Sequence, residues 1–387
     1  TPPVATGSAT GVLSDAPVQG VAYSTAPSGV TGTTDAQGRY SYNPGDTVTF
    51  QLGALTLGSA SATATVTPVA LAAGSAERLQ NLLVLLQSLD GNGVPADGIT
   101  IAAAAAAAVT TGIDLAQAPA SFGSATNAAL TAAMAAGGIS RAVTTPAAAQ
   151  AHFLAQAPVL LASHVWVGRY SDASGSGLFV QRFGSNGAYL SAGINTGTGT
   201  AASGIEVGSV QATLADGRGF KLAAQVPAGA TGSDWSLTGL SACERVRVTG
   251  DALVYDSAPA SCASDGSFTL AKADNNPTGI VGVWTGASAD VVHTQTFVFT
   301  ANGKYVMLDP EGDTENACGG PGIEYGSYTH DAATGQLRVT IQRDTNGCAG
   351  LSDTGTPGSF TLTLAADGRT GTFVAADGNF PITRVSN

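Results

Sequence analysis

The chain has 387 residues, of which 11% are charged, and its formal net charge is −12. This length allows two to four domains, and the 44% of hydrophobic residues excludes a disordered chain, which would be rich in charge and poor in aliphatic side chains. The 15 basic residues form no basic stripe, so nucleic acid and anionic membrane surfaces are poor partners. The longest apolar run, 101–109, is far shorter than the about 20 residues of a transmembrane helix, so no transmembrane segment is expected.

The first section, residues 1–70, is rich in strand and turn signals. Each of the stretches 34–42 and 44–52 is a turn followed by alternating polar and apolar residues, which is typical of a strand. Together with 17–21, these stretches resemble the small β-sandwich modules of bacterial surface proteins, of the carboxypeptidase-regulatory or transthyretin-like kind. The resemblance implies a β-sandwich that serves as a spacer or an adhesive unit.

The start of this section is a candidate assembly strand, because it carries no charged side chain before Asp15. Such a strand either pairs within its own module or extends a sheet edge of a neighbouring molecule, since an edge offers a row of unpaired backbone groups. The chain has only three Lys residues to guard its sheet edges, so head-to-tail addition would give a filament. The alternating residues of the candidate strand are Val4, Thr6, Ser8, Thr10 and Val12.

The second section, residues 71–164, is predicted to be helical. Ser75 is a helix N-cap, and leucines at 79, 82, 83 and 86 form one apolar stripe of a helix that ends near Asp90. The stretch 78–101 also resembles a segment that follows such β-modules in secreted proteobacterial proteins. The Ala-rich stretch 102–156 predicts three or four short helices, because alanine is the strongest helix former.

A possible calcium loop follows the first of these helices. Asp90, Asn92 and Asp97 supply oxygen ligands, but Val94 stands where an EF-hand needs another oxygen and no glutamate closes the loop. A turn that ends the helix is the alternative explanation of the same residues.

The rest of the chain contains one sequence pattern twice. Gly-Ile-Glu-Val-Gly-Ser at 204–209 returns as Gly-Ile-Glu-Tyr-Gly-Ser at 322–327, and other landmarks recur around both copies in the same order. Two duplicated domains are therefore predicted, at 165–278 and 279–387, each near the usual size of one domain. The recurring landmarks are Trp166 and Trp284, Asn186-Gly187 and Asn302-Gly303, Tyr189 and Tyr305, and Asp265 and Asp377.

Each copy is expected to hold about eight short antiparallel strands, because Asn-Gly and Asp-Gly pairs are strong hairpin signals. Whether these strands form an up-and-down barrel or a sandwich stays open. Gly282-Val283-Trp284 resembles the start of lipocalin-like barrels, although His164 replaces the glycine in the first copy. That resemblance implies an alternative function, the binding of a small apolar ligand inside a barrel. Both tryptophans are expected to plug one end of their domains.

No catalytic centre is predicted. The chain has no Gly-x-Ser-x-Gly elbow, and its four histidines stand in no familiar order with serine and aspartate. His293 and His330 fall in the same copy and could meet across a sheet. The equivalent Glu206 and Glu324 are expected to be structural, each held by strand backbone or an arginine.

The second copy carries an acidic loop. Four carboxylates within seven residues repel one another unless they are solvated or bridged by a hard cation. The loop is therefore either a solvated tip or a site for Ca²⁺, which is the one cofactor that the sequence suggests. The four residues are Asp309, Glu311, Asp313 and Glu315.

The four cysteines divide as two in each copy, which predicts one disulfide in each. The predicted pairs are Cys243–Cys262 and Cys318–Cys348, with four free thiols as the alternative. Disulfides imply an oxidising compartment, so the expected location is outside the cell or on the outer surface of a bacterium. A lipid anchor just before Thr1 stays open.

These observations predict a mainly β protein with an N-terminal β-sandwich module, an Ala-rich helical linker and two tandem antiparallel β-domains. The expected function is structural and non-enzymatic: a filament subunit that binds copies of itself, or an adhesin-like protein that binds a surface receptor.

Overall fold

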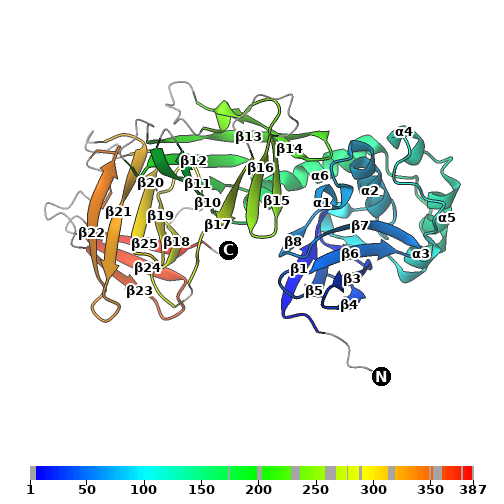
Figure 1. Ribbon diagram of the computed structural model, residues 1–387, viewed down its shortest axis with the longest axis horizontal. Coiled ribbons are helices and arrows are strands. Elements are labelled where there is room, and N and C mark those ends of the chain that lie inside the picture. Colours follow the sequence, from blue (N-terminus) through cyan, green and yellow to red (C-terminus); the bar gives the residue numbers. More distant parts are fainter. Residues whose placement is uncertain are drawn as a thin grey trace. The chain divides into compact units, whose positions relative to one another are not determined.

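The computed structural model describes residues 6–172, 175–197, 203–227, 236–257, 267–276, 278–286, 290–312, 319–347, 350–351, 360–375 and 378–385. Strands predominate, and the chain runs from a β-module through a helical section into two β-barrels (Figure 1). This confirms the predicted mainly β fold with a helical section and two tandem antiparallel domains.

The N-terminal module is a sandwich of a three-stranded sheet, β5-β1-β8, and a four-stranded sheet, β4-β3-β6-β7, with a small parallel pair, β2-β9, beside them. Its core is aromatic: the ring of Tyr40 meets Tyr23 at 5.8 Å and Phe50 at 5.2 Å, and these two rings come from the opposite sheet. The strands are β1 Ala9–Leu13, β2 Val18–Gln19, β3 Ala22–Ala26, β4 Thr31–Thr33, β5 Arg39–Tyr42, β6 Thr47–Leu52, β7 Leu55–Ser61, β8 Thr65–Val66 and β9 Ile99–Thr100.

The helical section is built around α2. As predicted, the side chain of Ser75 caps this helix by accepting a hydrogen bond from the Arg78 N–H at 3.2 Å. The buried face of the helix is wider than the predicted leucine stripe, because Asn81 and Gln87 are also buried. The helices are α1 Pro68–Ala72, α2 Ala76–Ser88, α3 Ala103–Ala108, α4 Pro119–Phe122, α5 Ala128–Ala136 and α6 Pro146–Leu161, with short 3-10 turns η1 Pro95–Asp97 and η2 Leu237–Gly239.

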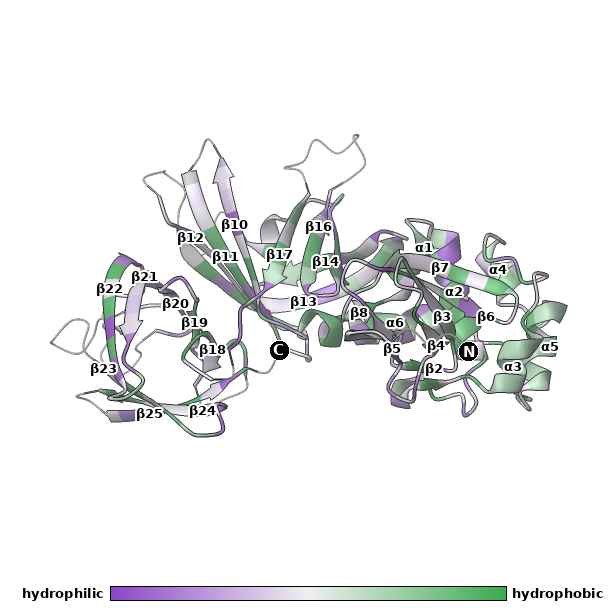
Figure 2. Ribbon diagram, turned by 60° about the horizontal axis from the view of Figure 1, so that its bottom comes forward, coloured by the Kyte–Doolittle hydropathy of each residue, from purple (hydrophilic) through white to green (hydrophobic). Residues whose placement is uncertain are grey.

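The Ala-rich stretch forms four helices, α3 to α6, in line with the prediction. Figure 2 shows α3 and α5 in pale green, because both consist largely of alanine, and the two helices pack against each other. Pro146 begins α6 and does not break a helix, since the first turn needs no N–H donor. Within the described residues, every helix is too short or too polar to cross a membrane.

Each copy of the repeat closes into an eight-stranded barrel, which decides between the two predicted alternatives. The first strand pairs with the last in both: Trp166 lies opposite Lys272, and Trp284 lies opposite Arg384. The first barrel comprises β10 Trp166–Asp172, β11 Gly175–Phe183, β12 Ala188–Asn195, β13 Gly204–Asp216, β14 Gly219–Gln225, β15 Arg245–Thr249, β16 Ala252–Asp256 and β17 Phe268–Lys272. The second comprises β18 Gly282–Thr285, β19 Thr296–Phe299, β20 Lys304–Asp309, β21 Gly322–His330, β22 Gln336–Asp344, β23 Phe360–Leu364, β24 Thr370–Ala375 and β25 Gly378–Arg384.

The two barrels share their strand register. Tyr189 of β12 lies opposite Gly208 of β13, and Tyr305 of β20 lies opposite Gly326 of β21. The Asn-Gly turns before these strands are also alike, with a glycine at positive φ in each, and both are the tight turns that the sequence predicts. The same pairing on the same landmarks confirms the duplication.

The chain divides into two compact units. The first holds 1–157, 212–221 and 243–268, and the second holds 158–211, 222–242 and 269–387. The boundary runs through the first barrel, whose turn glycines Gly217 and Gly250 belong to the first unit. There Gly217 forms a bridge with Gly74, between α1 and α2 of the helical section, and the Gly250 N–H donates to the Thr65 carbonyl of the module at 3.2 Å.

Two apolar clusters organise the second unit. One fills the second barrel with large side chains, including Trp284, Phe299 and Phe373. The other joins the barrels, because side chains of β11 and β12 such as Val180 pack with side chains of β20 and β21 such as Val306. The parts of the two barrels that belong to this unit therefore pack against each other.

Candidate functional site

The repeated Gly-Ile-Glu motif places one buried carboxylate in each barrel. Glu206 accepts a hydrogen bond from the Tyr189 hydroxyl at 2.7 Å, and Glu324 accepts one from the Tyr305 hydroxyl at 2.5 Å. Thr238 adds its N–H at 3.2 Å and its hydroxyl at 2.5 Å to the donors of Glu206. Burial raises the pKa of both tyrosines, so they keep their protons and donate. The donor shared by both glutamates is a tyrosine hydroxyl of the preceding strand, and not the strand backbone or the arginine that the sequence analysis expected.

The second glycine of the motif is required by packing. A Cβ on Gly208 would lie 2.2 Å from the carbonyl oxygen of Gln225, and one on Gly326 would lie 2.1 Å from that of Thr340. The ring of the paired tyrosine covers the same spot at about 3 Å in both barrels. No side chain fits there, which explains why the glycine recurs with the tyrosine and the glutamate.

Both tryptophans are fully buried plugs, as predicted. Each indole N–H donates at 2.8 Å to a carbonyl four or five residues earlier in the chain. The covers differ. In the second barrel the guanidinium of Arg384 lies 4.1 Å from the ring centre of Trp284 and donates to the Val281 carbonyl at 2.8 Å. In the first barrel Lys272 stands at the register position of Arg384, and the His164 ring meets Trp166 edge-on at 5.1 Å.

The acidic loop of the second barrel is already hydrogen-bonded where it is described. Asp309 is 2% exposed and accepts hydrogen bonds from two backbone N–H groups at 2.8 and 3.1 Å and from Gln295 at 3.2 Å. Glu311 lies 2.5 Å from Nδ1 of His293, and this hydrogen bond raises the pKa of His293. Among the described residues no three His, Cys, Asp or Glu side chains are grouped to hold a metal. Asp313 and Glu315 lie outside those residues, so calcium at this loop stays a prediction.

An arginine supports the loop that begins at Asp90. The carboxyl of Asp90 accepts from the Thr100 N–H at 3.0 Å, and its other oxygen has no hydrogen-bond partner among the described residues. Asn92 donates to both oxygens of Asp97, at 3.1 and 3.2 Å. Arg141 donates to three main-chain carbonyls at the end of α2, including that of Asp90 at 2.5 Å. A fixed guanidinium beside the loop favours the helix-ending turn, and calcium there also stays a prediction.

The candidate assembly strand is paired within its own module. Thr10 and Val12 belong to β1, the central strand of its sheet, with β5 on one side and β8 on the other. Ser8 precedes β1 and its N–H donates to Asn43 at 2.9 Å, while Thr6 lies before any strand. Val4 lies outside the described residues. Because both edges of β1 are occupied, adding it to a neighbour would require breaking these ladders.

Of the four cysteines, Cys243 lies within the described residues and is not a free thiol. Cys262, Cys318 and Cys348 lie outside the described residues, so the predicted pairing stays a prediction.

The histidines make separate contacts. His293 pairs with Glu311, whereas His330 Nε2 lies 3.0 Å from the Leu362 carbonyl. A contact between the two histidines, which the sequence left open, is not among these interactions, so they assemble no catalytic pair.

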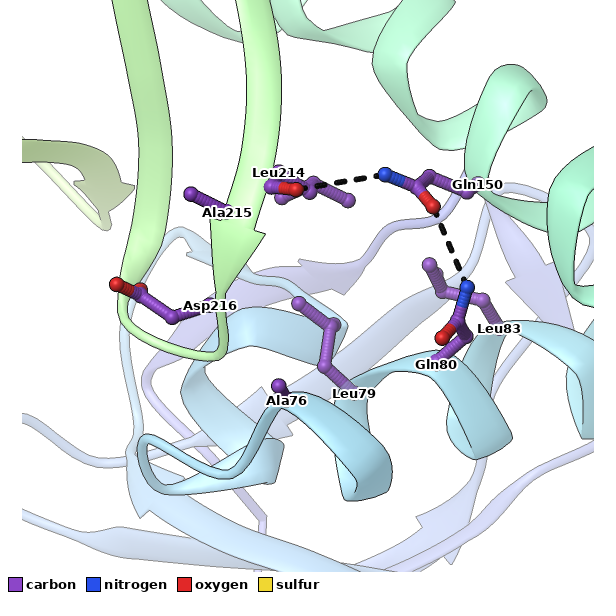
Figure 3. A pocket seen from close by; sticks show the side chains of 8 residues that line it. All are labelled: Ala76, Leu79, Gln80, Leu83, Gln150, Leu214, Ala215 and Asp216. Carbon is purple, nitrogen blue, oxygen red and sulfur yellow. Dashed lines mark hydrogen bonds between the residues drawn. The ribbon is translucent and has the colours of Figure 1, made fainter. Parts of the chain in front are cut away.

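One groove lies on α2 in the first unit (Figure 3). The figure shows Leu79 and Leu83 below it, with the amides of Gln80 and Gln150 bonded to each other at 3.2 Å. The Gln150 amide also donates to the Leu214 carbonyl at 3.5 Å. Because the amides satisfy each other and the volume is only about 110 Å³, the groove is too small for most ligands.

A larger groove of about 310 Å³ lies between the barrels in the second unit. Val167 and Val298 supply apolar lining, while Arg169, Lys272 and Asn302 supply polar groups. Its two sides come from β10 and β17 of one barrel and from the β19–β20 turn of the other. Sequence reasoning missed it because no local pattern links residues more than 100 positions apart.

A buried polar cluster in the first unit was also missed. Asp15 is fully buried, and its Oδ2 accepts a hydrogen bond from Gln87 of α2 at 2.9 Å. Its Oδ1 has no hydrogen-bond partner among the described residues and lies 3.9 Å from Nε2 of His152 on α6. That nitrogen is 2.6 Å from the Asp15 main-chain oxygen. Burial raises the pKa of Asp15 well above its usual range.

Comparison with known proteins identifies no family. No family model matches the chain, and no curated protein matches it. Among solved structures, the chain aligns with the Helicobacter pylori beta clamp bound to a DNA ligase peptide, at 11% identity and a TM-score of 0.11. It also aligns with the Pseudomonas aeruginosa DNA polymerase III subunit beta, at 10% identity and a TM-score of 0.10. The alignments cover 60% and 59% of this chain and span 62% and 58% of those chains. Scores this low carry no argument about fold or function.

Proposed function

We propose that this chain is a non-enzymatic, adhesin-like protein on the outer surface of a bacterium, with a surface receptor as its partner. The observation that carries the proposal is the packed interior of the second barrel. Twelve buried residues form one core there, including Trp284, Phe297, Phe299 and Tyr305. An interior filled by aromatic rings leaves little room for a ligand, which disfavours the alternative of a carrier barrel and leaves the outer faces for recognition.

Two further observations support this form of the proposal. The four cysteines divide as two in each copy, and the disulfides that this division predicts would suit an oxidising compartment outside the cytoplasm. The pairing of β1 on both edges favours a protein that acts as a folded unit over a filament built by strand donation.

The proposal is tested by labelling cells of the producing bacterium with antibodies against the full chain, before and after permeabilisation. We expect labelling of intact cells, and loss of cell attachment to a receptor-bearing surface when the protein is deleted. Labelling that appears only after permeabilisation would contradict the proposal. Negative-stain images of the purified chain distinguish the adhesin-like protein from the alternative of a filament subunit. Dispersed particles support the adhesin-like protein, and polymers support the filament subunit.

A further inference from the structure

The groove between the barrels has the size and lining of a small ligand site. Its volume of about 310 Å³ is at the lower end of the range for ligand pockets, about 300–1,000 Å³. The side chains of Val167 and Val298 and the methyl groups of Ala271 and Ala273 give it an apolar lining. Both walls belong to the packed body of the second unit, so the groove is built on strands that hold their positions.

The polar lining of the groove is rich in hydrogen-bond donors. Arg169 is exposed and makes no ion pair or hydrogen bond within the described residues. Asn302 is held by the Thr300 hydroxyl, which donates to its Oδ1 at 2.6 Å. This bond orients the amide and leaves the Nδ2 group for another acceptor. The site therefore suits a ligand rich in oxygen acceptors.

The charge of the groove selects an anion. The chain has 15 basic residues against 27 acidic ones, yet two of the basic residues, Arg169 and Lys272, line this groove with one carboxylate, Asp274. Guanidinium groups bind carboxylates with two parallel hydrogen bonds, and this geometry favours a carboxylate over a neutral ligand.

We propose that this groove binds an acidic saccharide, with its carboxylate on Arg169. The sugar hydroxyls bond to Asn302 and Asp274, and the apolar face of the ring lies on Val167 and Ala271. This inference rests on the proposed function, because it names the class of receptor as a surface glycan that ends in a sugar acid. A fatty acid fits less well, since the polar lining offers more partners than one carboxylate can use.

Titration calorimetry of the full chain with N-acetylneuraminic acid and glucuronic acid tests the inference, with galactose and glucose as neutral counterparts. We expect at least one acidic sugar to bind and both neutral sugars to fail. Arg169→Ala should weaken binding at least about 10-fold, because a charge-assisted hydrogen bond is lost, and Arg169→Lys should restore part of it. The matched control is Arg338→Ala, an exposed arginine on β22 that bonds Gln336 at 3.1 Å.

The inference is overturned if neither acidic sugar binds, if neutral sugars bind equally well, or if Arg169→Ala and Arg338→Ala behave alike. A protein that labels on intact cells but ignores both acidic sugars would overturn this inference and leave the proposed function standing. Labelling only after permeabilisation would overturn the proposed function, and the titration would still report on the groove.

Discussion

The two barrels differ little inside and much at their ends. Inside, both set a buried glutamate beneath a tyrosine hydroxyl, at 2.7 Å for Glu206 and 2.5 Å for Glu324. Both also place a glycine under the tyrosine ring, where a Cβ would clash with the next strand. These residues depend on one another, because a change in one removes a partner or a space that the others need. Duplicated copies can therefore diverge widely and still keep this set.

The ends of the two barrels contact different parts of the chain. In the second barrel, Arg384 of the last strand bonds Asn275 at 2.7 Å and the Gly368 carbonyl at 2.7 Å while covering Trp284. In the first barrel, Lys272 stands at the matching position. The turn glycines of that barrel instead approach the module, where a Cβ on Gly250 would lie 2.5 Å from Cβ of Thr63. The buried residues that stabilise the barrel are thus the same in both copies, whereas the residues at the barrel ends differ because each copy contacts different segments of the chain.

The largest expected effect comes from removing the arginine cover of the second barrel. Arg384→Ala deletes several hydrogen bonds to a charged group and the contact with the Trp284 ring, so we expect the local free energy of opening to fall by about 3 kcal/mol or more. Hydrogen exchange of the β18 and β25 amides measures this loss. Lys272→Ala in the first barrel is the matched control and should change exchange of β10 and β17 much less. Equal effects in the two barrels would refute the claim that their ends differ.

A smaller loss of stability is expected when the hydroxyl of Tyr189 or Tyr305 is removed. Tyr189→Phe and Tyr305→Phe each remove a donor from a buried carboxylate and should cost about 1–3 kcal/mol in thermal or urea unfolding. Burial raises the pKa of both tyrosines, so above pH about 10 the unfolded chain releases protons that the folded barrels retain. Stability of the wild type should therefore fall as pH rises through 10, and less steeply in the variants.

Tyr325→Phe is the control for both tyrosines. Tyr325 lies in the repeated motif itself, with the Lys304 ammonium 5.7 Å from its ring centre, and its hydroxyl makes no hydrogen bond within the described residues. We expect this variant to unfold like the wild type. A loss as large as that of Tyr305→Phe would show that ring packing, and not the bond to Glu324, sets the cost.

The sequence predicts what is local or repeated. Ser75 and the leucines after it define α2, and the Asn-Gly pairs define the turns, because these signals lie within one element. The repeat marks Glu206 and Glu324 as equivalent, and Tyr189 and Tyr305 as equivalent, but it does not reveal that each tyrosine donates to the glutamate of its barrel. Barrel closure, between strands about 100 residues apart, and the groove at Arg169 depend on pairings that no local pattern encodes. The prediction of a donated strand did not anticipate that β1 would have neighbours on both edges of its own sheet.

The smallest expected effect concerns Asp15, whose carboxyl contrasts with the well-bonded glutamates of the barrels. Gln87 is its hydrogen-bond donor at 2.9 Å, one oxygen lacks a partner among the described residues, and burial raises its pKa. As pH rises above the usual aspartate value of about 4, the unfolded chain releases this proton and the folded chain retains it, so the free energy of unfolding falls until the folded pKa is passed. Asp15→Asn removes this dependence while keeping an oxygen for Gln87.

We therefore expect Asp15→Asn to be about 1 kcal/mol more stable than the wild type at pH 7. This gain is near the lower end of the cost of an unpaired buried acceptor, because the new amide N–H₂ also needs a partner. The advantage should shrink as pH falls and vanish below about pH 4, where the carboxyl is protonated in both states. Urea unfolding at a series of pH values measures it. An advantage that does not change with pH would show that packing, and not the buried charge, decides the difference. A loss at every pH would mean that the carboxylate has a partner of opposite charge, and the contrast with the barrel glutamates would then fail.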